Sequence, residues 1–448
     1  MNIKIRLIGI LFSTFFLFLA LLIGYKIYFF WSFVYFFYFV PILIFLAASL
    51  YVTFISKKED SIKNFLIFIF SIFFSLCFIE FFLIKTDNLK FFKRYADSKK
   101  YKINYDFRRK IDVVRQTSGS VPSMHVFTDG QINIDSEKLN IIPISGVSNA
   151  KTILCNENGF WVKYQSDRYG FRNDNIVWDE NQIEYLLIGD SFAHGACIND
   201  ENTISSNLSK LSKKKSINLG IGGNGPILHY ASIKEFGVFK KPKKIIWMFN
   251  IGDFLFDFEN EIKNEILLNY LNDENYRQNL KEKTTEIDKI YQNIVDTYLK
   301  SIFFLKFINI RSTLNQFNAN LKKDSYKKDT KNDQTNKIKK FIQITKMIKK
   351  LSDTNNSEIY FVYTPIIEEY SEKFKKQNIL EYENFLKYKP IIMNIIKEEN
   401  INIIDLHQLK WIKDKDPIGN YAMRQQMNHY TPEIYDEISE IIFLNSKN

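Results

Sequence analysis

Cysteine is scarce in this chain, with three residues among 448, and none lies in a CxxC pair or a His-Cys cluster. Because structural zinc sites are built from such paired ligands, the sequence indicates no metal site. Residues 220–225, GIGGNG, match the spacing of the GxGxxG fingerprint of dinucleotide-binding folds. No acidic residue ends the next apolar run, residues 243–250, where a ribose partner would be expected, and this argues against a nicotinamide or flavin dinucleotide. We therefore expect a protein that works without a cofactor.

The net charge of +11 raises the question of nucleic acid binding. Residues 321–350 hold eleven Lys and three Asp, and so supply +8 of this excess. Between positions 322 and 337 the segment is polar, and Tyr326 is its only aromatic residue. Because a charged run without apolar neighbours does not form a core, we interpret this segment as a solvated loop and expect no nucleic acid partner.

Long apolar runs are concentrated in the first 86 residues. Residues 5–25 carry one charge, at Arg6, and residues 28–55 carry none. Residues 62–84 carry Lys63 near the start and Glu80 near the end, where we expect the Glu80 side chain to reach the membrane surface. Each run is close to the ~20 residues that cross a bilayer as a helix. We predict that residues 1–86 form a membrane anchor of three transmembrane helices.

The basic residues beside these runs predict the orientation of the anchor. Lys4 and Arg6 precede the first run and Lys57 and Lys58 follow the second, whereas the loop between the two holds only Lys26. The positive-inside rule places the N-terminus in the cytoplasm, and three spans then place the rest of the chain outside. We expect a multi-pass protein of the bacterial inner membrane, in contact with the lipid bilayer, with its C-terminal domain in the periplasm.

An external location changes what the cysteines can do. Cys77 lies in an apolar run and packs there, whereas Cys155 and Cys197 lie in the polar part of the chain. The periplasm is oxidising, so Cys155 and Cys197 could form a disulfide. The bond would tie the segment before the first expected strand to the loop after Ser191.

Beyond a juxtamembrane segment at residues 87–150, the pattern predicts a hairpin over residues 155–174 and then alternates strand and helix. Expected strands cover residues 183–188, 217–220, 243–250, 358–365 and 401–405. Expected helices cover residues 200–211, 228–239, 390–400, with Pro390 in the first turn, and 431–444. The alternation predicts an α/β domain over residues 151–448 with a doubly wound parallel sheet. Residues 259–351, between the third and fourth strands, read as a helical insertion.

Ser191 stands at the carboxyl end of the first expected strand, in the stretch YLLIGDSFAHG. Ligands of doubly wound sheets bind at such strand ends, and Gly189 permits a tight turn there. Ser191 could be a nucleophile, or it could only cap the following helix. A serine nucleophile needs a base, and among the five histidines we favour His429, which precedes the last helix.

Four blocks together resemble the SGNH (GDSL-type) hydrolase superfamily over residues 155–448. The blocks are GDSF at 189–192, NLGIGGNGP at 218–226, FNIGDF at 249–254 and NHYTPEIY at 428–435. A further stretch, SDRYGFRND at 166–174, is similar to the Gly-Phe-Arg segment often found upstream. The resemblance implies a flavodoxin-like sheet, Ser191 as nucleophile and His429 as base. It also implies an oxyanion hole formed by the Ser191 and Gly223 amides and a third-block side chain.

Two positions depart from the family pattern. Where the third block normally carries an oxyanion-binding asparagine, this chain offers Gly252 or Asp253, depending on the alignment. Asp253 could act when protonated, Asn250 could substitute, or the two amides could suffice. The last of the four blocks, at 428–435, which is the fifth block of the family, usually has an aspartate three residues before its histidine, where this chain has Gln426. The site could be a Ser-His dyad, or Asp405 at the end of the fifth expected strand could complete a triad.

The resemblance implies a periplasmic serine acyl-ester enzyme. Membrane-anchored members of the superfamily often modify cell-envelope or exported polysaccharides, frequently as O-acyltransferases. An acyl donor and a polysaccharide acceptor would then be the partners, and a separate membrane protein could supply the acyl group. The alternative is a catalytically degenerate module that kept the fold and binds or assembles polysaccharide.

Overall fold

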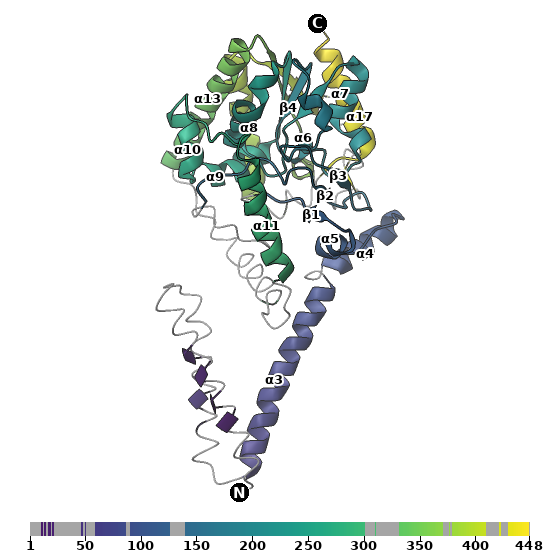
Figure 1. Ribbon diagram of the computed structural model, residues 1–448, viewed down its shortest axis with the longest axis vertical. Coiled ribbons are helices and arrows are strands. Elements are labelled where there is room, and N and C mark those ends of the chain that lie inside the picture. The colour runs from purple at the N-terminus through teal and green to yellow at the C-terminus, as the bar shows by residue number, and fades with distance from the viewer. Residues whose placement is uncertain are drawn as a thin grey trace. The chain divides into compact units, whose positions relative to one another are not determined.

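The computed structural model describes residues 59–86, 90–125, 139–300, 331–370, 379–408 and 429–447, together with isolated positions elsewhere in the chain. The chain divides into two compact units, which are treated separately below (Figure 1). The first unit comprises residues 1–88 and 303–323, and the second comprises residues 89–302 and 324–448.

The first unit is described mainly through α3 (Glu59–Lys85), a helix of 27 residues. Most of the predicted spans 5–25 and 28–55 lies outside the described residues, and the predicted span 62–84 falls within α3. In the described part of the chain, no helix combines the length and the apolar character that a bilayer crossing needs. The membrane location therefore stays a prediction.

The side chain of Glu80 in α3 does not lie where the sequence predicted it. Its side chain is buried, with 1% of its surface exposed, and its carboxylate accepts a hydrogen bond from the backbone N–H of Ile310 at 2.9 Å. The prediction that Glu80 reaches for a polar surface is wrong, because a backbone donor of the same unit takes the place of water.

The second unit begins with α4 (Lys90–Tyr101) and α5 (Lys110–Gln116), followed by a three-stranded sheet. The strands are β1 (Ser120–Pro122), β2 (Lys151–Ile153) and β3 (Lys163–Gln165). β1 and β2 are parallel, and β2 and β3 are antiparallel. The predicted hairpin therefore exists, but its first strand precedes Cys155, and residues 155–159 lie in the connection.

A five-stranded parallel sheet forms the core of this unit, with the strand order β5-β4-β6-β7-β8. The strands are β4 (Tyr185–Ile188), β5 (Ser216–Asn218), β6 (Lys244–Phe249), β7 (Glu358–Tyr363) and β8 (Asn402–Asp405). β4, β5 and β6 are buried along their whole length, as strands of a sheet that is covered on both faces must be. The predicted α/β fold with a parallel sheet is confirmed.

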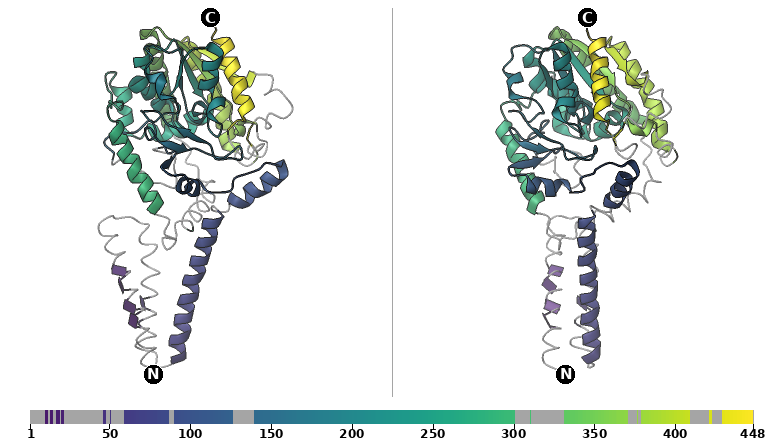
Figure 2. Two further views of the ribbon diagram at one scale, coloured as in Figure 1. Left: turned by 45° about the vertical axis from the view of Figure 1, so that its right-hand side comes forward. Right: turned by 90° about the vertical axis from the view of Figure 1, so that its right-hand side faces the viewer.

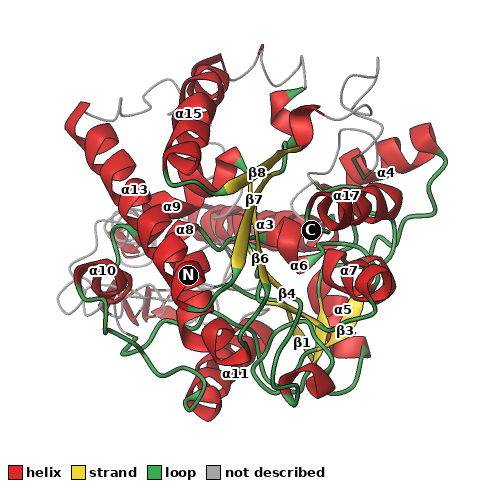
Figure 3. Ribbon diagram, turned by 90° about the horizontal axis from the view of Figure 1, so that it is seen from above, coloured by secondary structure: helices red, strands yellow, loops and turns green. Residues whose placement is uncertain are grey.

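Helices cover both faces of the sheet (Figure 3). α7 (Ile204–Ser212) and the last helix α17 (Pro432–Asn445) pack together on one face. Figure 2 shows α17 in yellow along the outside of the unit. α8 (Pro226–Ser232) and α13 (Lys331–Thr354) lie on the other face. Short helices are α6 (Ser191–His194), η3 (Asn175–Trp178), η4 (Asp200–Asn202), η5 (Ile233–Gly237), η6 (Val238–Lys240), η10 (Ile367–Glu369) and η11 (Leu406–Gln408).

α15 (Ile379–Glu398) begins well before its predicted start, so Pro390 lies inside the helix and not in its first turn. Tyr388, in the earlier part of α15, packs its ring 5.2 Å from that of Phe254. Burial of such aromatic side chains outweighs the hydrogen bond that the proline removes from the helix.

The predicted insertion between β6 and β7 contains several helices among its described residues, joined by turns such as residues 273–283. Its helices are η7 (Asp253–Asp257), α9 (Phe258–Glu261), α10 (Glu265–Asn272), α11 (Thr284–Lys300) and α13. The predicted lysine-rich loop lies partly outside the described residues, and from Lys331 onward it is α13. Phe341 and Ile344 on α13 are fully buried, so an apolar face holds this lysine-rich segment in a helix.

Candidate active site

Ser191 is positioned by a tight turn at the end of β4. Gly189 has a φ of +145°, and an added Cβ atom would lie 2.7 Å from the backbone oxygen of Met248. A side chain at this position would therefore be strained and would clash with β6. Asp190 caps the following short helix by accepting a hydrogen bond from the Phe192 N–H at 2.9 Å. Ser191 thus stands at the carboxyl end of an inner strand of the sheet.

His429 comes to Ser191 from the other end of the α/β domain, just before α17. Its Nε2 atom lies 2.8 Å from the Ser191 Oγ atom. The backbone oxygen of His429 accepts a hydrogen bond from the Ala422 N–H at 2.8 Å, and its ring packs 5.3 Å from the ring of Phe192. The geometry is that of a general base in direct contact with a nucleophile.

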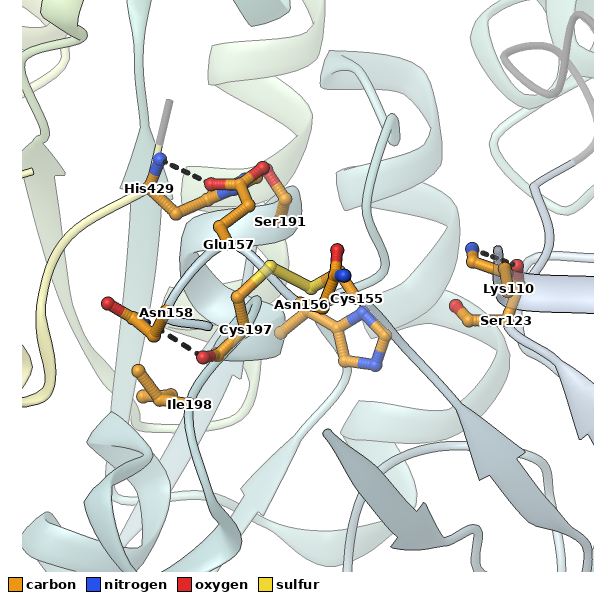
Figure 4. Close-up of a disulfide and its surroundings, with 12 residues drawn as sticks. Lys110, Ser123, Cys155, Asn156, Glu157, Asn158, Ser191, Cys197, Ile198 and His429 are labelled. Carbon is orange, nitrogen blue, oxygen red and sulfur yellow. Dashed lines mark hydrogen bonds and ion pairs between the residues drawn. A yellow bond between two sulfur atoms is a disulfide. The ribbon is translucent and has the colours of Figure 1, made fainter. Parts of the chain in front are cut away.

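Glu157 is the acid of the arrangement (Figure 4). Its carboxylate lies 2.9 Å from His429 Nδ1 and also accepts the backbone N–H of His429 at 3.1 Å. One side chain therefore fixes both the ring and the backbone of His429. The carboxylate holds a hydrogen on Nδ1, which leaves Nε2 able to accept the Ser191 proton. Sequence reasoning missed this residue.

Glu157 and His429 each shift the pKa of the other. Burial opposes the charged form of His429, but the Glu157 carboxylate outweighs burial and raises the pKa of His429 above its usual value. Burial likewise opposes ionisation of Glu157, yet the facing imidazole lowers the pKa of that carboxyl below its usual value. Glu157 is therefore ionised at neutral pH and stabilises the imidazolium that forms when His429 takes a proton.

Asp405, proposed from the sequence as the third triad member, is engaged elsewhere. It lies 3.1 Å from the Lys389 Nζ atom and accepts the backbone N–H of His407 at 3.0 Å. Asp405 ends β8, an edge strand, and two strands, β7 and β6, separate β8 from the strand that carries Ser191. The proposal of Asp405 is wrong, because the strand that carries it is not a neighbour of the strand that carries Ser191. Gln426 lies outside the described residues.

A disulfide links the segment that carries Glu157 to the segment that follows Ser191. Cys155 and Cys197 are bonded, so the segment that carries Glu157 is linked to the loop that follows α6 (Figure 4). We call the five residues Cys155–Gly159 the acid arm. The pairing offered by the sequence is present, and it connects two segments of the site.

The glycine-rich loop after β5 lies against Ser191. A Cβ atom added at Gly222 would lie 3.4 Å from the Ser191 Cβ atom, and Gly223 has a φ of +87°. Glu261 of α9 anchors the end of this loop by accepting the N–H groups of Gly225 and Ile227 at 2.7 and 2.8 Å. Burial raises the pKa of Glu261 to about 8. The insertion thus holds the loop whose Gly223 amide is our predicted oxyanion donor.

The third block does not supply a free side-chain donor. The Asn250 amide donates one hydrogen to Asp190 at 2.9 Å and the other to Asp253 at 2.8 Å. Burial, with Asp190 nearby, raises the pKa of Asp253 well above its usual value, which disfavours a charge that would repel an oxyanion. Both side chains belong to a buried acid network beside Ser191, whose Oγ atom lies 3.2 Å from Asp190. The arrangement favours the backbone amides as oxyanion donors.

One group of ligand-type atoms lies in the described residues. Atoms of Glu157, Cys197 and His429 lie within 4.8 Å of one another. The sulfur of Cys197 is already bonded to Cys155, and the other two side chains face each other and Ser191. Since a disulfide sulfur is not a thiolate ligand, this group fits a serine site better than a metal site.

No protein-family model matches the chain, and no curated protein is significantly similar to it. Several solved structures are similar to it, among them the following three. The first, a lipolytic protein of the G-D-S-L family from Desulfitobacterium hafniense DCB-2, is 15% identical at a TM-score of 0.30, covering 58% of this chain and 97% of its own. An acetyl xylan esterase is 12% identical at a TM-score of 0.33, and the match covers 58% of this chain and 99% of the esterase. A GDSL-like lipase from Bacteroides thetaiotaomicron VPI-5482 is 12% identical at a TM-score of 0.29, and the match covers 58% of this chain and 86% of the lipase.

The molecule's own features define its class. A parallel sheet with an inner first strand, a Gly-Asp-Ser turn at the end of that strand and a histidine before the last helix make it an α/β protein with a Ser-His-Glu site. With its four sequence blocks on these elements, the chain resembles the SGNH (GDSL-type) hydrolase superfamily.

Proposed function

We propose that the protein is a serine acyl-ester enzyme that uses Ser191, His429 and Glu157 as a catalytic triad. The observation that carries the proposal is the continuous contact between the three side chains, 2.8 Å from Ser191 Oγ to His429 Nε2 and 2.9 Å from His429 Nδ1 to Glu157. A serine that only caps a helix needs neither of these contacts.

The geometry supports a two-step reaction. His429 Nε2 takes the hydroxyl proton while Ser191 Oγ bonds to the acyl carbon, and the carbonyl oxygen becomes an oxyanion facing the Ser191 and glycine-loop amides. The ester bond then breaks, and His429 returns its proton to the departing alcohol. The same histidine next activates water or a second hydroxyl, which takes the acyl group and restores Ser191.

The acyl acceptor decides between esterase and O-acyltransferase. Both reactions share all steps up to the acyl-enzyme, so the triad supports either one. We propose that the substrate is an acyl ester of a cell-envelope or exported polysaccharide. A polysaccharide is then the acceptor in the transfer reaction, and a separate membrane protein supplies the acyl donor.

We further propose that the protein is anchored in a bacterial inner membrane with the triad in the periplasm. The apolar runs of the first 86 residues support this location, as do the exposed apolar side chains of α3, such as Phe68, Phe74 and Phe78. The disulfide is in keeping with an oxidising compartment.

The test is labelling of the purified full-length protein with a fluorophosphonate, which reacts with activated serines. Mapping by peptide mass spectrometry should find the label on Ser191 and nowhere else. His429→Ala should abolish the labelling, and His407→Ala, which changes a histidine outside the site, should preserve it. A folded wild-type protein that takes up no label contradicts the enzyme proposal and favours a polysaccharide-binding module, in which the occupied Asn250 amide would mark the lost activity.

A further inference from the structure

The acid arm is tied down on the side away from the triad. Asn156 accepts a hydrogen bond from the Tyr105 hydroxyl at 3.0 Å, and its amide donates to the backbone oxygen of Asp106 at 2.8 Å. The Asp106 N–H in turn donates to the backbone oxygen of Gly159 at 2.7 Å. The segment after α4 therefore grips the arm on both sides of Glu157.

The arm is also tied to both other members of the triad. The disulfide bonds Cys155 to Cys197, just after the nucleophile helix. The Asn158 amide donates to the backbone oxygen of Cys197 at 3.0 Å (Figure 4). It also lies 3.5 Å from the backbone oxygen of Tyr430, the residue after His429. Asn158 thus bridges the loop behind Ser191 and the segment that carries the base.

We propose that the Cys155–Cys197 disulfide, with Asn158, is the positioning device of the triad, so that the enzyme works in its disulfide form and loses its acid on reduction. This inference rests on the proposed function. Glu157 lies on a connection between two short strands and has no helix or strand of its own to hold it. A carboxylate that is displaced from Nδ1 no longer orients the ring, and a displacement of about 1 Å can cost about 10²-fold in rate.

The redox step is an ordinary exchange with a dithiol, such as dithiothreitol or a dithiol oxidoreductase. Cys197 is fully buried and Cys155 is partly exposed, so the attacking thiolate bonds to the Cys155 sulfur and Cys197 leaves as a thiolate. The second thiol of the reductant then displaces Cys155. The reductant becomes a disulfide, and two electrons and two protons pass to the two cysteines.

A disulfide that only stabilises the fold would lower activity regardless of the acid. The two roles are separated by comparing wild type with Glu157→Gln, each full-length and purified, before and after reduction. In wild type, kcat for p-nitrophenyl acetate should fall about 10²-fold on reduction and recover on re-oxidation, with KM little changed. In Glu157→Gln, reduction should change kcat little, because the group it releases is already gone. An equal loss in both proteins overturns the inference.

A second readout does not depend on activity. The pKa of His429 can be followed by NMR of isotope-labelled histidine, with the signal assigned by its loss in His429→Gln. Reduction should lower this pKa, because the Glu157 carboxylate leaves the ring, and Asn158→Ala should lower it by a smaller amount. Cys77→Ser, which removes the free cysteine, should leave the redox response intact.

The two readouts distinguish the two proposals. A His429 pKa that is the same in the oxidised and reduced forms overturns the positioning role of the disulfide, whatever the enzyme does. A redox-dependent pKa in a protein whose serine takes no fluorophosphonate supports the positioning role and rejects the proposed esterase chemistry.

Discussion

Two histidines of this molecule each face a carboxylate near the carboxyl edge of the sheet, yet only one of them can serve a serine. His429 has Glu157 on Nδ1 and the Ser191 hydroxyl on Nε2. His407 has Glu369 on Nε2 at 3.1 Å, while its Nδ1 atom faces Lys389 at 2.6 Å. Burial opposes the charge on both rings, and the facing carboxylates outweigh it, so both pKa values are raised.

The comparison shows that an acid beside a histidine does not make a catalytic base. Both ring nitrogens of His407 already have partners, so the ring acts as one member of an ion-pair cluster that ties β8 to α15 through Asp405 and Lys389. His429 has the same kind of acid on one nitrogen, and a nucleophile on the other. The function follows from what the second nitrogen faces.

Removing each histidine in turn gives the largest expected contrast. His429→Ala should lower kcat/KM for p-nitrophenyl acetate by about 10⁴-fold or more, because the base and its proton transfer are lost. His407→Ala should leave the rate unchanged within error. Equal losses would mean that both rings act on the substrate, and would break the comparison.

Neutralising each acid is the next contrast. Glu157→Gln should lower kcat by about 10⁴-fold, since the ring loses both its orientation and its counter-charge. Asp405→Asn is the matched change in the other cluster and should leave kcat near wild type. Circular dichroism checks that both variants are folded. A larger loss of kcat in Asp405→Asn than in Glu157→Gln would mean that Asp405, at the end of β8, is the acid of the site.

The pH dependence of activity sharpens the comparison further. His429 acts as a base only when neutral, so kcat/KM should fall as the pH drops through its raised pKa, which lies above the ordinary value of about 6.5. Glu157→Gln removes the charge that raises this pKa and should move the acidic limb to lower pH. Asp405→Asn should leave the limb in place. A limb that does not move in Glu157→Gln would mean that another group titrates.

The smallest effect concerns stability. A histidine with a raised folded pKa stabilises the fold below its unfolded pKa, and this stabilisation is lost as the pH rises through the folded value. The melting temperature of wild type should therefore fall as the pH rises above about 6.5, the ordinary pKa of histidine. His407→Ala should reduce this fall by about 2 °C, while a change at exposed Glu440 should not. A fall of unchanged size in His407→Ala would mean that its ion-pair cluster contributes no stability.

The sheet and the contact between Ser191 and His429 could be predicted because each follows from a local pattern. The apolar strands mark their own positions, and Gly189 and the start of the last helix place Ser191 and His429. Glu157 has no such signal, since it lies in an irregular connection that is fixed by contacts with distant residues. The expected pairing of Cys155 with Cys197 could have pointed to it, because that bond brings this connection to the nucleophile.

The third block shows a different limit of sequence reasoning. Asn250 and Asp253 lie where a donor was expected, at the end of β6, but a sequence does not say which neighbour an amide will bind. The structure gives both hydrogens of Asn250 to Asp190 and Asp253. Buried carboxyl groups compete strongly for any donor nearby, and here they take the amide that could have substituted for the oxyanion-binding asparagine.

The position of Glu157 before β4 has a consequence for which part of the chain is needed to build the complete site. A fragment cut at the start of β4 would retain every strand of the large sheet, the nucleophile and the base, and still lack the acid and the cysteine that secures it. A chimera that exchanges only the sheet and its helices would inherit the same deficiency. A fragment that carries the complete site must therefore be longer than one that carries only the large sheet and its helices. It has to start no later than Tyr105 and Asp106, which hold the acid arm.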